Sequence, residues 1–287
     1  MSVITKLYGG ELEIVYNPDD KYHRYVVNSP KNGLINHKSV SVTTATGIVD
    51  KSNQLMSWAV DLFKSFLEEE LKNNKIINLQ SIIAGAGLYT IRKTDAGNIG
   101  TLAHKWISEY IKHKINGDLL PVIPTDQKVQ IAVNAFLTWE NKHKLKYHFT
   151  EKTVYSLNHD YIGTMDIGAM VDGFFCEIDL KTGSGIYDET RAQTVAYLKA
   201  DEEESGKHYE GRWALRLAKE TEEEYIAGKI KKKKKTFPKY QVFEPIFYDN
   251  NTIEKDFEAF LGMLKVVKWK KELKEIATAK FLLNKKI

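Results

Sequence analysis

The sequence is poor in cysteine and in proline, and it has no long apolar run. Its one cysteine, Cys176, excludes an internal disulfide framework, a cysteine-rich zinc site and a cysteine-held iron–sulfur cluster. A lone cysteine fits a reducing cytosol, so we expect an intracellular, cytoplasmic protein. No stretch approaches about eighteen consecutive apolar residues, and we therefore expect no transmembrane helix and no membrane partner. The first residues, MSVITKLYGG, lack the charged-then-apolar order of a signal peptide.

Several catalytic signatures are missing as well. The sequence contains no G-x-x-x-x-G-K-[ST] motif, which excludes an attached P-loop ATPase or helicase. It contains no G-x-S-x-G and no HExxH, the signatures of a nucleophile elbow and of a zinc peptidase. GAGLYT is too short for a dinucleotide-binding loop and follows no strong strand, so we expect no nucleotide cofactor.

The composition is that of an ordinary globular protein. Apolar residues make up 43% of the 287 residues and aromatic residues 11%, which predicts one large domain over 1–287. The 42 lysines and arginines exceed the 38 acidic residues by a net charge of +4. Such a mild excess permits an anionic partner but does not require one.

The patterning divides the domain into three regions. Residues 1–50 predict strands, because LEIVYN, YHRYVVN and SVSVTT are separated by the turn-like clusters PDDK and NSPKNG. Residues 51–146 predict a helical region. Its amphipathic stripe begins at Leu55, its glycines at 85 and 87 indicate a loop, and a strong helix spans about 97–115. A further helix follows Pro124, with Thr125 or Asp126 as its N-cap.

Residues 147–287 predict a mixed sheet and a long C-terminal helix. Three hairpin strands fall within 148–181, a helix spans about 188–203, and strands follow near 211–218 and at QVFEPIFY. The charged segment 219–235, with its lysine run 231–235, indicates a solvated loop or hairpin tip, and a phosphate-binding role for the lysines is the alternative. This order predicts an α/β or α+β fold with a mixed sheet flanked by helices.

The strand FFCEIDLK carries the most informative pattern. Its even positions are apolar, from Phe174 to Leu180, and its odd positions include Glu177, Asp179 and Lys181. An amphipathic strand with one solvated face is the structural alternative. The preceding strand YIGTMDIGAMV contains a single charge, Asp166, which is costly to bury unless it is paired or bound to a metal.

A hairpin turn joins these two strands, so Asp166 and Asp179 are expected to approach each other. Two neighbouring carboxylates repel, and a divalent cation relieves that repulsion. Hard oxygen ligands favour magnesium or manganese over zinc. An ammonium at Lys181 could then orient a water molecule or offset charge on a phosphate.

Asp166 followed by Asp179-Leu180-Lys181 resembles the signature of the PD-(D/E)XK nuclease superfamily. Further motifs are similar to its RecB-like branch, which includes phage and mitochondrial genome-maintenance exonucleases. They occur in order over roughly residues 40–200, and the rest of the chain matches only in outline. The segments are SVTT, LMSWAV, GNIGTLAHKW with His104, GTMD, DLKTG, and QTVAY with Gln193 and Tyr197. Members of that branch with an iron–sulfur cluster use several cysteines, and this chain departs from them.

The resemblance implies a restriction-endonuclease-like core and a set of site residues. Asp166, Asp179, His104 and the backbone carbonyl of Leu180 would bind Mg²⁺ or Mn²⁺, and Lys181 would position or activate the attacking water. As a structural alternative, His104 shares a face with Ile107 and Ile111 and would be a core histidine. Supporting or DNA-contacting roles fall to Gln193, Tyr197, Glu151 and Glu177. Of these, Glu177 is expected to be solvated or to support the site, with a third acidic ligand as the alternative, and Gln193 and Tyr197 could be structural caps.

The implied function is a metal-dependent DNA exonuclease, cellular or phage-encoded, that acts in recombination, repair or degradation of DNA. Its expected partner is DNA, as a single strand or a duplex end. A recombination or single-strand-binding protein and a second copy of the chain are open as further partners. Two alternatives remain, a structure- or site-specific endonuclease of the same fold and a catalytically silent DNA-binding recombination protein.

Overall fold

The computed structural model describes residues 2–17, 25–73, 76–231 and 236–284. The strands are β1 (Val3–Leu7), β2 (Leu12–Tyr16), β3 (Tyr25–Ser29), β4 (Leu34–His37), β5 (Val40–Ser41), β6 (Leu145–Ser156), β7 (Tyr161–Val171), β8 (Phe174–Lys181), β9 (Gly211–Leu217) and β10 (Phe243–Tyr248). The α-helices are α1 (Val42–Thr46), α2 (Ser52–Lys72), α3 (Leu79–Asn116), α4 (Gln127–Glu140), α5 (Glu189–Ser205), α6 (Glu222–Lys231) and α7 (Ile253–Asn284).

The central sheet is mixed. Its strands lie in the order β10-β9-β8-β7-β5, and β6 pairs with the other edge of β7. β8 runs parallel to β9 and β5 parallel to β7, whereas the other neighbours are antiparallel. The hairpin strands β6, β7 and β8, the helix α5 and the strands β9 and β10 confirm the expected order. The chain therefore has an α/β fold with a mixed sheet.

A fork opens where β7 and β8 stop pairing. The two strands are paired from Val171 and Phe174 as far as Ile167 and Ile178. Beyond that point β8 continues beside β9, while β7 pairs at Tyr161 with the short strand β5. Asp166 and the end of β8 thus lie at the fork.

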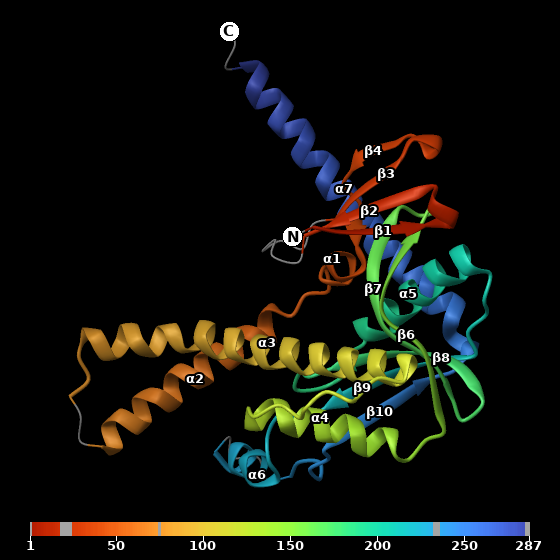
Figure 1. Ribbon diagram of the computed structural model, residues 1–287. Helices are drawn as coiled ribbons and strands as arrows, with labels where there is room; N and C mark the ends of the chain where they lie inside the picture. Colours follow the sequence, from red (N-terminus) through yellow and green to blue (C-terminus); the bar gives the residue numbers. More distant parts are fainter. Residues whose placement is uncertain (1, 18–24, 74–75, 232–235, 285–287) are drawn as a thin grey trace.

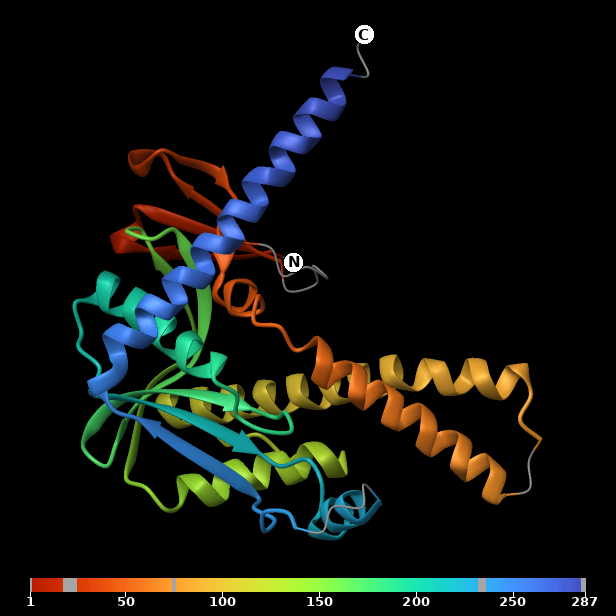
Figure 2. The same ribbon diagram turned by 180° about the vertical axis from the view of Figure 1, so that it is seen from behind.

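Helices cover both faces of the sheet (Figures 1 and 2). On one face, α3 and α4 pack against apolar side chains of β7, β8 and β9, including Ile178 and Leu215. On the other face, α5, α7 and α1 pack around Met165, Tyr161 and Phe175. Ile178 and Phe175 lie on opposite faces, as the alternation of β8 predicted, although Phe174 at the hairpin is exposed.

The N-terminal strands form a separate antiparallel sheet in the order β1-β2-β3-β4. It packs through Leu12 and Ile14 against Tyr155 and Ile162 of the central sheet. The expected strand SVSVTT is wrong beyond Ser41, because Val42–Thr46 form α1. The Ser41 hydroxyl accepts a hydrogen bond from the Thr44 amide and caps this helix, which outweighs the strand preference of its β-branched residues. PDDK lies outside the described residues.

A helical arm projects from the body (Figures 1 and 2). It consists of α2 packed against the first half of α3. The loop expected at glycines 85 and 87 is wrong, because α3 is continuous from Leu79 to Asn116. Gly85 lies against the rings of Phe63 and Phe66 in α2, so close packing between the helices offsets its low helix propensity.

The segment 219–235 is only partly a loop. Glu222–Lys231 form α6, whose first turn carries three acidic residues that suit the positive end of a helix. The expected loop or hairpin tip is therefore wrong for this stretch, although most of its residues are exposed as expected, and residues 232–235 of the lysine run lie outside the described residues. Among the described helices, none combines the length and the apolar character that crossing a membrane requires.

Candidate metal centre

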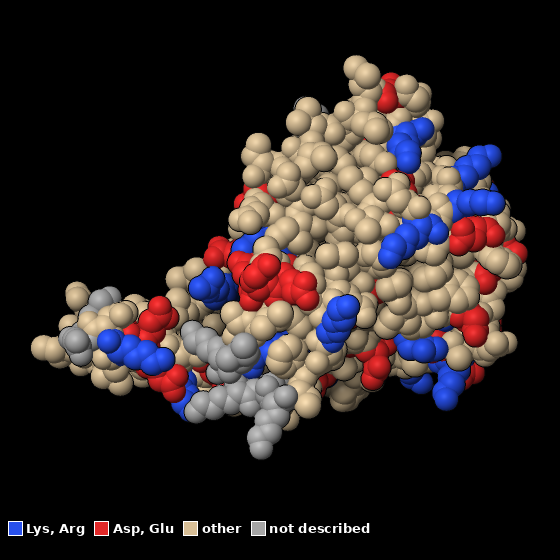
Figure 3. Space-filling view, turned by 90° about the horizontal axis from the view of Figure 1, so that it is seen from below, with Lys and Arg blue, Asp and Glu red and all other residues tan. Residues whose placement is uncertain are grey.

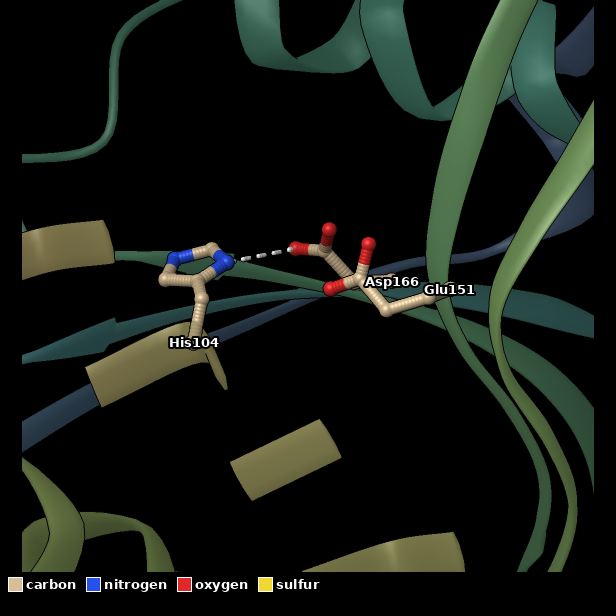
Figure 4. A group of neighbouring side chains, drawn as sticks. All are labelled: His104, Glu151 and Asp166. Atoms are coloured by element: carbon tan, nitrogen blue, oxygen red, sulfur yellow. Dashed lines mark ion pairs between the residues drawn. The ribbon is translucent and has the colours of Figure 1, made fainter. Parts of the chain in front are cut away.

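An imidazole and two carboxylates meet at the fork (Figure 4). His104 comes from α3, Glu151 from β6 and Asp166 from β7, and their ligand atoms all lie within 4.8 Å of one another. The Nδ1 atom of His104 is 3.6 Å from Oδ2 of Asp166. Residues far apart in the sequence therefore converge on one point.

The approach of α3 to the sheet explains how His104 reaches this point. Its neighbours Ala103 and Ile107 are fully buried in the core beneath α3, while His104 is partly exposed. A Cβ atom at Gly100 would lie 2.5 Å from Oγ1 of Thr182, just after β8. Only glycine fits at this contact, and it brings the helix turn before His104 against the end of β8.

An irregularity in the β6–β7 hairpin brings the two carboxylates to the same side. Glu151 has a φ of 50°, an unusual value for a non-glycine residue inside a strand. Met165 and Ile167 are two residues apart, yet they enter the cores on opposite faces of the sheet. A regular strand would place both on one face, so β7 twists sharply at Asp166. The Thr150 hydroxyl donates to the Asp166 carbonyl at 2.8 Å and holds this turn of the strand.

The electrostatics of this group favour a cation. The surrounding protein, and then the negative charge of Asp166, raise the pKa of Glu151 to about 7, although its side chain remains open to solvent. Two carboxylate oxygens and one imidazole nitrogen are ligands that Mn²⁺ accepts, and Mg²⁺ also takes oxygen donors. With metal–ligand distances of about 2.1–2.3 Å, opposite ligands lie up to roughly 4.6 Å apart, so the observed spacing fits one ion after a small closure.

Asp179 and Lys181 form a second group on β8. Oδ2 of Asp179 lies 2.5 Å from Nζ of Lys181. Burial raises the pKa of Asp179 to about 6, against the opposing effect of Lys181 and with a further increase from Asp166. The side chain of Asp179 is 2% exposed and does not belong to the group of His104, Glu151 and Asp166. Its expected role as a metal ligand stays a prediction.

A hydrogen-bonded relay extends from Lys181 into α5. Nζ of Lys181 donates to Oε1 of Gln193 at 3.1 Å, and Nε2 of Gln193 donates to the hydroxyl of Tyr197 at 3.0 Å. Tyr197 is buried, and a Cβ atom at Gly163 would lie 2.4 Å from its ring. Gln193 and Tyr197, which the sequence analysis expects to face the site together, thus lie next to Lys181, and their supporting or DNA-contacting roles stay predictions.

Glu177 is not solvated, because its side chain is fully buried, and its supporting role stays a prediction. Neither of its carboxylate oxygens has a hydrogen-bond partner among the described residues. Burial, and then the charge of Asp179, raise the pKa of Glu177 well above its ordinary value. The expectation of a solvated carboxylate is wrong because α5 and α7 cover this face of the sheet.

Leu180 connects the two groups. Its amide donates a hydrogen bond of 2.8 Å to Oδ2 of Asp166, and its side chain is buried in the core under α3 and α4. The expected role of its carbonyl as a metal ligand stays a prediction. The two groups therefore share one backbone connection across the fork.

A cleft of about 680 Å³ opens over His104, Glu151 and Asp166. Thr101, Lys105, Ser108 and Lys112 of α3 also line it, and the sequence reasoning missed them. Helical spacing could have found Thr101, Ser108 and Lys112, which lie three residues before, four after and eight after His104. The Ser108 hydroxyl is buried and has no hydrogen-bond partner among the described residues.

Comparison with known proteins leaves the family of the chain open. No protein-family model matches the sequence, and no curated protein matches it. The resemblance described from the motifs therefore enters below as a proposal, which rests on residues and geometry.

Proposed function

We propose that the chain is a metal-dependent DNA exonuclease with a restriction-endonuclease-like core, from the RecB-like branch of the PD-(D/E)XK superfamily. One observation carries the proposal. Asp166 and the sequence Asp179-Leu180-Lys181 lie on neighbouring strands where these strands separate, and α3 delivers His104 to the same point. The order of the elements supports it too, because α5 and then β9, which runs parallel to β8, follow the antiparallel meander β6-β7-β8.

Mg²⁺ or Mn²⁺ is the cofactor we propose. His104, Glu151 and Asp166 would hold it, with Asp179 and the Leu180 carbonyl as further ligands suggested by the resemblance. When bound, such a cation lowers the pKa of water and neutralises charge on a phosphoryl oxygen. Glu151 would then be a ligand, a stronger role than the supporting one that the sequence suggested.

Lys181 acts as a cation and not as a general base. Burial favours its neutral form, but the charges of Asp179 and Asp166 outweigh burial and raise the pKa of Lys181 above its ordinary value. An ammonium has three donors, of which Gln193 accepts from one, while Asp179 forms an ion pair with it. A remaining donor is free to donate to a phosphate oxygen, where it would stabilise the charge that develops during cleavage.

Gln193 and Tyr197 act on Lys181. Gln193 lines a cleft together with Lys181, so its side chain can reach a bound phosphate. Tyr197 is buried, and its hydroxyl accepts from Gln193, which gives it the positioning role and no contact with DNA. Together they fix the ammonium between α5 and the end of β8.

The proposal is tested with end-labelled linear DNA, single- and double-stranded, incubated with Mg²⁺, with Mn²⁺ or with a chelator. We expect metal-dependent release of short products from linear DNA, while a covalently closed circle of the same sequence stays intact. Cleavage of the circle would instead identify an endonuclease of the same fold. DNA binding with no product under any metal would identify a catalytically silent protein and overturn the proposal.

The control for a contaminating nuclease is Asp166→Asn, purified in parallel. It keeps the size of the side chain and an oxygen that can accept from the Leu180 amide, but it removes the negative charge. We expect it to lose cleavage while its circular dichroism and thermal unfolding match those of the wild type. Equal cleavage by both proteins would show that the fork is not the active site.

A further inference from the structure

A second groove, distinct from the metal cleft, lies between the short segment β5–α1 and the helix α7. It encloses about 480 Å³. Of the described residues that line it, every charged one is a lysine, namely Lys38, Lys270, Lys271 and Lys274. The chain as a whole has nearly as many acidic as basic residues, 38 against 42, so the exclusively positive charge of the groove is a local feature.

Other surfaces lack this bias. The metal cleft combines Lys105 and Lys112 with Glu109, Glu151 and Asp166. The face that Figure 3 shows also intersperses basic and acidic side chains. A concave surface with cations alone concentrates its positive potential and attracts a polyanion. The groove is therefore the described hollow best suited to a chain of phosphates.

The lysines of the groove are available for a ligand. Nζ of Lys270 and of Lys274 has no hydrogen-bond or ion-pair partner within the described ranges, and both side chains are exposed. Nζ of Lys271 donates to the carbonyl of Lys38 at 2.9 Å, which joins the two walls of the groove. The walls are thus joined, and none of the four lysines forms an ion pair with a carboxylate among the described residues.

The remaining lining suits a nucleic acid strand. Ser41 and Thr44 supply hydroxyl groups that can form hydrogen bonds with phosphate oxygens. Tyr25 supplies an aromatic ring, which stacks on Tyr16 with 4.8 Å between the ring centroids. Lysines that follow a backbone, next to an aromatic side chain, are the arrangement by which proteins bind single strands without reading their sequence.

The groove neighbours the proposed active site. Gly47 lines both the groove and a neighbouring cleft of about 290 Å³, and that cleft also contains Lys181 and Gln193. Gly183 lines this second cleft, and the adjacent residue Thr182 lines the metal cleft. Three hollows therefore follow one another from α7 to His104.

We infer that the groove binds the sugar–phosphate backbone of single-stranded DNA, at nucleotides beyond the one held at the metal centre. The inference names the substrate strand and its path, and in this it rests on the proposed nuclease function. Binding in the groove contributes affinity for long strands and leaves the chemistry at Asp166 and Lys181 unchanged.

The test compares two double variants that remove the same charge from α7. Lys270→Ala with Lys274→Ala removes two of the four lysines from the groove. Lys255→Ala with Lys265→Ala removes two exposed lysines of the same helix that do not line the groove. Each is made in the Asp166→Asn background for binding and in the wild-type background for cleavage, and thermal unfolding verifies that each protein is folded.

Binding of a labelled single strand of about twenty nucleotides is measured by fluorescence anisotropy at several salt concentrations. We expect the groove variant to bind at least about tenfold more weakly, with a salt slope smaller by about 1.4, since each lost phosphate contact on a single strand contributes about 0.7. The Lys255 and Lys265 variant should match the parent. Equal affinity and equal slope in both variants would overturn the inference, as would a loss confined to duplex DNA.

Cleavage separates this inference from the proposed function. We expect the groove variant to raise KM for the long strand and to cleave a strand of about four nucleotides like the wild type. If the wild type cleaves nothing while the groove variant loses binding, the nuclease proposal fails, but the inference that the groove binds single-stranded DNA is supported. If the wild type cleaves and the groove variant is unchanged in both assays, the groove inference fails alone.

Discussion

The Leu180 amide donates a hydrogen bond of 2.8 Å to Oδ2 of Asp166, across the point where β7 and β8 stop pairing. An amide at such a fork loses its ladder partner on that side, and the carboxylate takes the partner's place. The contact fixes the rotamer of Asp166 and sets the distance between the two halves of the candidate site. The Asp166 carboxylate therefore accepts from the backbone at the fork and is also a ligand of the proposed metal ion.

Glu151→Gln should weaken Mn²⁺ binding by about tenfold or more, because the group would lose one of its two negative charges. Isothermal titration with Mn²⁺ measures this directly. Glu109→Gln is the matched control, since Glu109 lines the same cleft but lies outside the group of His104, Glu151 and Asp166. If both variants bind Mn²⁺ like the wild type, Glu151 is not a ligand.

Lys181→Ala should reduce the cleavage rate by at least about two orders of magnitude, as the loss of one transition-state stabiliser does. Asp179→Asn should cause a similar loss, because Asp179 holds the ammonium in place. The two residues act as a unit, so the double variant should be little worse than either single one. Single-turnover cleavage with saturating Mn²⁺ measures the three rates, and Lys51→Ala, from the same cleft, is the control. Wild-type rates in Asp179→Asn would remove this pair from the site.

Gly100→Ala should impair both metal binding and cleavage, because the new methyl group would meet Oγ1 of Thr182 at 2.5 Å and displace α3 with His104. Removing the obstacle with Thr182→Ala in the same chain should restore much of the loss. Gly97→Ala, where nothing lies within 4 Å, should leave activity unchanged and raise stability by about 0.5–1 kcal/mol. A double variant no better than Gly100→Ala would argue against this contact as the cause.

The sequence predicted the elements in which apolar side chains recur with the period of a strand or of a helix. The alternation in β8 and the helical spacing in α4 survive because each element has one face toward a single core. The N-cap of α4 is Asp126, one of the two residues expected. The motif residues His104, Asp166 and Lys181 also converge near the fork, although their assigned roles remain predictions.

Features that depend on long-range packing were not predictable from local patterns. Val42–Thr46 have strand-forming residues but form a helix that α5 and α7 cover. Gly85 predicts a loop from the sequence alone, and only its packing against α2 accounts for the helix at this position. The burial of Glu177 could not be foreseen, because the alternation of β8 identifies two faces but not which helices cover them.

Asp160 is expected to make stability depend on pH. It lies between the N-terminal sheet, β6 and α7, and it accepts hydrogen bonds from Ser39 at 2.7 Å, Tyr155 at 2.9 Å and Lys268 at 3.0 Å. Burial opposes its ionisation, but these hydrogen bonds outweigh burial and lower the pKa of Asp160 from 3.8 to about 2. The charged form is therefore favoured in the folded state. Its contribution is fully present above the unfolded value of 3.8 and is lost as the pH falls through about 2.

Asp160→Asn isolates this charge, because asparagine tolerates the left-handed φ of 49° that Asp160 adopts. At pH 7 the variant should lose about 1–2 kcal/mol of unfolding free energy, a value reduced for the one-third exposure of the side chain. Urea unfolding at pH 5 and 3 should show a smaller difference from the wild type at pH 3 than at pH 5. Asp61→Asn, on the exposed face of α2, should show no such trend. A difference that grows as the pH falls would reverse the sign of the shift and would mean that burial dominates at Asp160.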